Sequence, residues 1–225
     1  MRWPFRRKVS ARQYQRAVTE IGKGLFGTAV VLSQRLKQGW APLSGAPDLN
    51  NDQWMRIVAQ IIWYQLSKCE EAILELELDV RITDDIAERS FARFMAEMDF
   101  THCGSEQAQE QARCTQLNQL RQWQGEAAAD YRRPMKAVTP EQRREILRTG
   151  SLIPDDPLDR LARRIESEVG MRLRHSDTQR QKDVFKRVSS EGISLEDVYV
   201  STVAGIQPFT DMFEELGFIE TFRCR

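Results

Sequence analysis

His102, Cys103 and Cys114 have the side chains of metal ligands. Imidazole nitrogen and thiolate sulfur are the donors that zinc prefers, and a helical turn could bring Cys114 back toward the other two. However, the spacing matches no zinc-binding pattern, the chain has no Cys-x-x-Cys pair, and no fourth ligand is evident. We therefore predict no metal site and no cofactor here.

Gly22, Gly24 and Gly27 have the Gly-x-Gly-x-x-Gly spacing of a loop that cradles phosphate groups. Such a loop needs a strand before the first glycine and a helix after the last. Here the residues before Gly22 are polar and have helical periodicity. We therefore interpret the glycines as points where a helix bends or where another helix approaches closely.

Acid–base or nucleophilic catalysis would need a constellation that two histidines do not provide. Glu71 and Glu75 share a helix face at i,i+4, but acidic side chains on a helix face are usually solvated. We predict no catalytic residue and favour a non-enzymatic role. A helical enzyme that uses carboxylates stays open as an alternative.

The two termini carry the residues most suited to binding a partner. Residues 1–8 combine four basic residues with Trp3 and Phe5, and could bind nucleic acid, an anionic membrane surface, another protein or the acidic middle of this chain. The apolar tail, residues 218–225, would pack in its own core or in a partner's groove. The candidate partner-binding residues are Arg2, Trp3, Phe5, Arg6, Arg7, Lys8, Phe218, Ile219 and Phe222.

Formal net charge is zero, but the charges are segregated along the chain. Residues 1–40 contain nine basic residues and one acidic residue, whereas residues 41–130 contain 16 acidic and seven basic residues. Residues 131–190 are basic again, with 15 against nine, and residues 191–225 are acidic. Such blocks either neutralise each other within the fold or meet a partner of opposite charge.

The stretch 51–82 is the element around which we expect the other helices to pack. It contains no Gly or Pro, and its apolar residues recur with helical spacing, so it predicts a long helix capped by Asn51 or Asp52. Apolar residues on its remaining sides predict burial by several neighbours. Residues 74–82 alternate strictly between apolar and charged residues, so a strand pairing with 198–203 or 218–222 stays open there.

Further helices are predicted by apolar periodicity and by capping signals. We expect them at 10–38, from Thr83 or Asp84 to about 100, at 106–131 with a thin apolar seam, from Thr139, and from Asp156. The Arg-rich segment 160–187 is interpreted as a solvated helix face because acidic residues interrupt it.

The sequence therefore predicts an all-α or nearly all-α fold, a multi-helix bundle around a long central helix, with minor β structure left open at 74–82 and at the C-terminus. The charge reversal at Arg132-Arg133-Pro134 suggests two regions, 1–132 and 133–225, which could still form one domain.

Composition limits the cellular setting. The 225 residues are 41% hydrophobic and 29% charged, which is enough for a packed core. No apolar run approaches the roughly 18 residues of a membrane span, and no signal-peptide pattern follows the basic start. Four widely spaced cysteines fit reduced thiols. We expect a cytoplasmic protein that is not an integral membrane protein.

These observations favour a non-catalytic helical interaction protein: an adaptor, an inhibitor or a subunit of a larger assembly. Its expected partner is another protein or a copy of itself. The first alternative is nucleic-acid binding through the basic segments 1–16 and 132–187.

Overall fold

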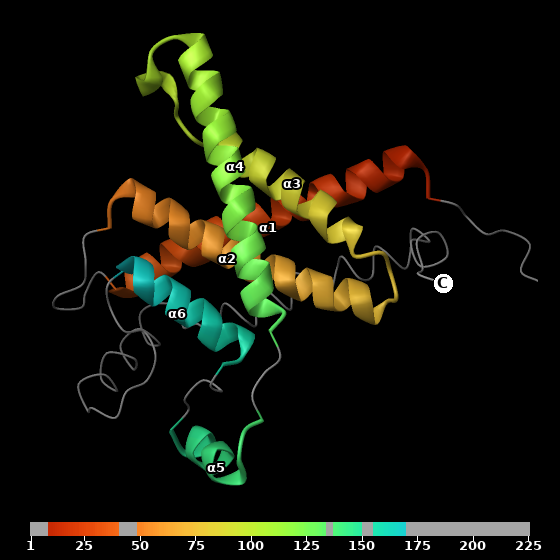
Figure 1. The fold of residues 1–225 in the computed structure, drawn as a ribbon, viewed down its shortest axis with the longest axis vertical. Helices are drawn as coiled ribbons and strands as arrows, with labels where there is room; N and C mark the ends of the chain where they lie inside the picture. Colours follow the sequence, from red (N-terminus) through yellow and green to blue (C-terminus); the bar gives the residue numbers. More distant parts are fainter. Residues whose placement is uncertain (1–8, 41–48, 134–136, 150–154, 170–225) are drawn as a thin grey trace, which may run out of the picture. The chain divides into compact units, whose positions relative to one another are not determined.

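A computed structural model describes residues 9–40, 49–133, 137–149 and 155–169, and this part of the chain contains no strand. The helices are α1 (Ala11–Trp40), α2 (Asn51–Glu75), α3 (Arg81–Ala96), α4 (Glu106–Tyr131), α5 (Pro140–Thr149) and α6 (Pro157–Val169), with a short 3-10 turn, η1 (Thr101–Cys103), before α4 (Figure 1). The all-α prediction is confirmed. The strand candidates at 198–203 and 218–222 lie outside the described residues.

Three helices begin where their capping signals predicted. The Ser105 hydroxyl accepts a hydrogen bond from the Ala108 amide at 3.3 Å, immediately before α4. Before α5, Thr139 accepts from the Gln142 amide at 3.2 Å. Before α6, Asp156 accepts from the Asp159 amide at 2.7 Å. Each cap satisfies an amide that has no partner within its helix.

Two predicted caps are wrong. Asn50, rather than Asn51 or Asp52, caps α2, because its side chain accepts from the Gln53 amide at 2.9 Å while the Gln53 side chain accepts from the Asn50 amide at 3.1 Å. Helix α3 begins at Arg81, before Thr83 and Asp84. Thr83 is buried inside the helix, and Asp79 accepts a bond from the Arg81 amide at 3.0 Å.

The predicted single helix over 51–82 is interrupted. Helix α2 ends at Glu75 in a Schellman motif, in which the Glu77 amide donates to the Leu74 carbonyl and the Leu78 amide donates to the Ile73 carbonyl, both at 2.9 Å. Glu77 has φ 57°, the left-handed conformation at which glycine usually terminates a helix. Leu78 and Ile73, the two positions that typically form an apolar contact in this motif, are both 1% exposed. Residues 74–82 are therefore a helix end, a turn and a new helix, with an isolated β-bridge at Leu78 but no strand.

The described residues divide into two compact units. Unit 1 contains 9–28 and 65–126, and unit 2 contains 29–40, 49–64, 127–133, 137–149 and 155–169. Residues 57–66 of α2 are all buried, so the prediction of a central helix covered on more than one side is confirmed. Helix α4 ends at Tyr131, one residue before the predicted boundary; whether residues 1–132 form a separate domain stays a prediction.

In unit 1 the first half of α1 packs on α3. A Cβ atom at Gly22 would lie 2.6 Å from the Arg89 Cβ and 2.9 Å from the Ser90 nitrogen, so Gly22 permits the close approach of α3. The Phe26 and Phe94 rings meet edge to face with centroids 6.0 Å apart. The interpretation of a glycine as a close-approach site is confirmed at Gly22.

In unit 2, α6 contacts the first half of α2. The Gln53 side-chain amide donates to the Glu168 carbonyl at 3.0 Å, and the Glu168 carboxylate lies 3.6 Å from Arg56. The apolar side chains Leu158, Leu161 and Ile165 of α6 are buried. Within this unit α2 also meets α4, where the Tyr64 and Tyr131 rings are 6.0 Å apart.

Candidate interaction surface

The nine side chains predicted to bind a partner lie outside the described residues. They belong to residues 1–8 and to the tail beginning at Phe218. Their roles stay predictions, and any candidate surface must be built from the residues between them.

His102, Cys103 and Cys114, the residues with metal-ligand side chains, do not come together around one point. The Cys103 sulfur lies 3.5 Å from the His102 ring nitrogen, and the Cys114 thiol points to Glu110 at 3.8 Å. Within the described ranges, no group of three or more His, Cys, Asp or Glu side chains is arranged to hold a metal ion. Gly22, Gly24 and Gly27 lie inside α1, so no strand precedes them.

An acidic surface with exposed apolar side chains surrounds the turn between α2 and α3. Leu74 is 53% exposed and Val80 is 40% exposed, while Leu78 between them points into the core. Residues 70–88 contain eight carboxylates and a single basic residue, Arg81. We define the turn surface as the exposed side chains of Glu71, Leu74, Glu75, Glu77, Val80 and Asp84.

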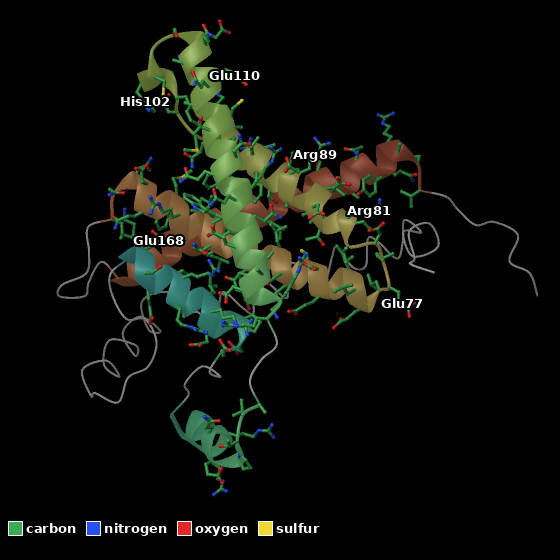
Figure 2. The ribbon with its side chains drawn as sticks, in the orientation of Figure 1. Glu77, Arg81, Arg89, His102, Glu110 and Glu168 are labelled. Carbon is green, nitrogen blue, oxygen red and sulfur yellow. The ribbon has the colours of Figure 1, made fainter. Side chains whose placement is uncertain are left out.

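The basic side chains nearest to the turn already have partners. Arg81 binds Asp79 and lowers the pKa of that carboxyl, chiefly through their side-chain hydrogen bond. Lys68 lies 2.7 Å from Glu71, and Arg89 bonds to the Gln15 side chain. Figure 2 labels Glu77 and Arg81, which bracket Leu78, Asp79 and Val80. Lys68, Arg81 and Arg121 thus each pair with one of the eight carboxylates of residues 70–88.

Tyr14 ties the start of α1 to α3 close to this surface. Its hydroxyl donates to the Asp85 carboxylate, one turn after the start of α3. Burial and then the Asp85 carboxylate raise the pKa of Tyr14, so the phenol keeps its proton and its donor role. The first turns of α1 therefore lie beside the first turns of α3.

A second cluster, around Arg160 in unit 2, corrects the interpretation of 160–187 as a solvated face over residues 160–169; residues 170–187 lie outside the described residues. Arg160 is 1% exposed and donates to the carbonyls of Asp130, Tyr131 and Arg133 at the end of α4, the last at 2.8 Å. A guanidinium caps the helix C-terminus well because its donors fit several carbonyls at once.

Asp155 balances the arginines of this cluster. Its carboxylate lies 2.7 Å from both Arg133 and Arg163 and 3.5 Å from Arg160. Hydrogen bonding to Arg163, followed by the charges of the other two, lowers the pKa of Asp155 to about 2. Arg164 lies 3.1 Å from Asp130. These arginines are occupied inside unit 2, while the basic residues of 170–187 lie outside the described residues.

The first turns of α4 are solvated. Residues 106–119 include no buried side chain, and Leu120 is the first buried residue of the helix. Arg121 anchors the following turn to α3 through a two-bond pair with Glu88 at 2.7 and 2.8 Å. The thin seam predicted for this helix is thus left uncovered at its start.

Sequence reasoning found the acids of the turn surface but missed the surface itself. Glu71 and Glu75 were interpreted as solvated, and Leu74 was placed on a helix continuing to Ile82. The break after Glu75 leaves Leu74 exposed on the last turn of α2. The signal that could have located the turn surface is the alternation of apolar and charged residues over 74–82.

No protein-family model, no curated protein and no solved structure matches this chain. None of the described helices has the length and apolar character needed to cross a membrane. Any functional proposal therefore depends on the residues of the chain itself.

Proposed function

We infer that this chain is a non-catalytic helical interaction protein, whose turn surface binds a segment of another protein that carries basic and apolar side chains. The observation that carries this proposal is the exposure of Leu74 and Val80, at 53% and 40%, among the carboxylates of residues 70–88.

The chemistry of the surface specifies its partner. Burying one exposed Leu side chain gives about 1.5–3 kcal/mol, so Leu74 and Val80 supply affinity only to a partner with apolar side chains. The surrounding carboxylates repel acidic segments and attract basic ones, which speeds association and selects the partner more than it tightens the complex. A basic segment with one or two large apolar residues meets both requirements.

The test compares matched surface variants. The test immobilises three forms of the protein: wild type, Leu74→Ser/Val80→Ser and the control Val31→Ser. Each is incubated with nuclease-treated cell extract, and the proteins that it captures are quantified by mass spectrometry. Val31 is 48% exposed but belongs to unit 2 and has no acidic residue near it in the sequence. We expect at least one protein in stoichiometric amount on wild type and on the control, and its loss from the double variant.

A second variant pair isolates the charges. Glu75→Lys/Glu77→Lys changes the turn surface, whereas Glu106→Lys/Glu141→Lys changes net charge equally at exposed sites elsewhere. Only the first pair should reduce capture. An identical set of captured proteins on all variants, or none on any, would contradict the proposal. Capture of nucleic acid that weakens steeply with salt would instead support the nucleic-acid alternative.

A further inference from the structure

We propose that Cys103 is a modification site, whose thiol exchanges with small-molecule disulfides while the His102 side chain takes up the thiol proton. The site lies outside the turn surface and does not depend on the function inferred above. It follows from a comparison of the described cysteines, Cys69, Cys103 and Cys114, because each has different surroundings.

The Cys103 thiol has a proton acceptor beside it. Its sulfur lies 3.5 Å from the Nε2 atom of His102. An unprotonated imidazole nitrogen accepts the hydrogen of a thiol placed in this way, and the thiolate, rather than the thiol, is the form that attacks a disulfide. Cys103 is partly exposed and His102 is exposed, so a small reagent reaches the sulfur. Cys103 therefore combines access with a base.

The Asp99 carboxylate supports this base. It accepts hydrogen bonds from the Thr101 hydroxyl at 2.7 Å and from the Thr101 amide at 2.8 Å. These two bonds, followed by the charge of His102, lower the pKa of Asp99. An ionised carboxylate near an imidazole stabilises the imidazolium that forms when the ring takes up a proton. Asp99, His102 and Cys103 thus form a sequence of acid, base and nucleophile.

The turn that carries the pair is fixed by contacts on both sides. Before it, Phe100 is 6% exposed and the Arg113 guanidinium lies over its ring, 5.5 Å from the centroid. Within it, the Cys103 amide donates to the Phe100 carbonyl at 2.9 Å. After it, Gly104 has φ 83°, and its carbonyl accepts from the Gln109 side chain at 2.9 Å. These contacts keep the base and the nucleophile in one short turn.

The other two described thiols have no base beside them. Cys114 is exposed, but its thiol points to the Glu110 carboxylate at 3.8 Å, and a negative charge beside a thiol opposes its ionisation. Cys69 is buried, and burial raises the pKa of its thiol to about 12. Figure 2 shows His102 and Glu110 at the same end of α4. The expected order of reactivity is therefore Cys103, Cys114 and Cys69, although Cys114 is the most exposed.

The proposed step is a thiol–disulfide exchange. His102 takes the proton of Cys103, and the thiolate attacks one sulfur of the small-molecule disulfide. A bond forms between the Cys103 sulfur and that sulfur while the S–S bond of the reagent breaks, and the leaving thiolate receives the proton from the imidazolium. Cys103 and half of the reagent end as a mixed disulfide, and the other half of the reagent is reduced to a thiol.

The experiment exposes the reduced full-length protein to the disulfide of mercaptoethanol, an uncharged probe whose approach the neighbouring charges do not steer. The reaction is stopped with acid at successive times, and peptide mass spectrometry gives a rate for each cysteine. We expect Cys103 to react about tenfold faster than Cys114, with Cys69 slower than both. His102→Gln should lower the rate at Cys103 about tenfold and leave the rate at Cys114 unchanged.

Glu110→Gln is the matched control, because it changes the neighbour of Cys114 rather than that of Cys103. It should raise the rate at Cys114 and leave the rate at Cys103 unchanged. The slow rate at Cys69 reports in every variant that the fold is intact. Equal rates at Cys103 and Cys114 in wild type, or an unchanged rate at Cys103 in His102→Gln, would overturn the proposal.

Discussion

Ser90 donates its hydroxyl hydrogen to the Gly22 carbonyl at 3.2 Å, and its backbone nitrogen would lie 2.9 Å from a Cβ atom placed at Gly22. These two residues lie where α1 and α3 approach each other closely. The contact explains one glycine of the Gly-x-Gly-x-x-Gly spacing without any nucleotide. It also makes the packing of unit 1 sensitive to a single methyl group.

Gly22→Ala should destabilise the protein, whereas Gly27→Ala should stabilise it. The new methyl group at position 22 meets Arg89 Cβ at 2.6 Å, and overpacking of this kind costs about 1–3 kcal/mol. Position 27 has nothing within 4 Å, so alanine there gains about 1 kcal/mol of helix propensity. Urea unfolding followed by circular dichroism measures both. Equal effects at the two sites would contradict the close approach.

Glu77→Gly should raise stability, and Glu71→Gly should lower it. Glu77 has φ 57°, a conformation that costs an L-residue about 1 kcal/mol and that glycine adopts freely. Glu71 lies inside α2, where glycine costs about 1 kcal/mol. Thermal unfolding of both variants provides the comparison. A loss of stability in both would show that the left-handed turn at Glu77 does not form in solution.

Arg160→Lys should cost far more stability than Arg144→Lys. The Arg160 guanidinium is buried and donates to three carbonyls, an arrangement that a single ammonium cannot reproduce. Disrupting buried charged interactions of this kind costs about 3–5 kcal/mol. Arg144 has a side chain that is 79% exposed, so its change should be nearly neutral. Similar unfolding midpoints for the two variants would show that the Arg160 side chain is not buried against these carbonyls.

Asp155 should make stability depend on pH in the acid range. Its pKa in the folded protein is about 2, below the ordinary value of 3.8, so the carboxylate stabilises the folded state above about pH 4. This contribution falls away as the pH is lowered from about 4 to about 2. Asp155→Asn should flatten the stability profile in that window. The control is Asp52→Asn, an exposed aspartate outside the cluster, and equal slopes in both variants would refute the role of Asp155.

Cys69 should resist alkylation while Cys103 and Cys114 react. Cys69 is buried, and burial raises the pKa of its thiol to about 12, so the reactive thiolate is scarce at neutral pH. Cys103 is partly exposed and Cys114 is exposed. Pulsed iodoacetamide labelling with peptide mass spectrometry distinguishes the sites. Rapid labelling of Cys69 without denaturant would mean that α2 opens locally.

The apolar periodicity of the sequence was sufficient to predict α1, most of α2 and α6. Val18, Ile21, Leu25, Leu32 and Leu36 are all buried, as their helical spacing predicted. Such stripes are reliable because burial of apolar area dominates the packing of a helix. The capping signals at Thr139 and Asp156 were equally direct, because each depends on residues only three positions apart.

The features that sequence analysis missed depend on contacts or conformations without a local signal. Glu77 occupies the left-handed position at the end of α2, where a glycine would have predicted the helix end. In the sequence, Arg160 cannot be distinguished from a surface arginine, because the carbonyls that it binds, at 130–133, lie about 30 residues earlier in the chain. The turn surface was missed for the same reason, because an unbroken helix over 51–82 would have no turn after Glu75.

The uncovered start of α4 has a consequence for how the helix holds its hydrogen bonds over time. A helical stretch of 14 residues without buried side chains is marginal in water. Its amide protons therefore exchange with solvent through brief fraying, while those beyond Leu120 exchange only when the packing of the helix opens. One continuous helix thus contains a gradient of lifetimes, from short at Glu106 to long at Tyr131.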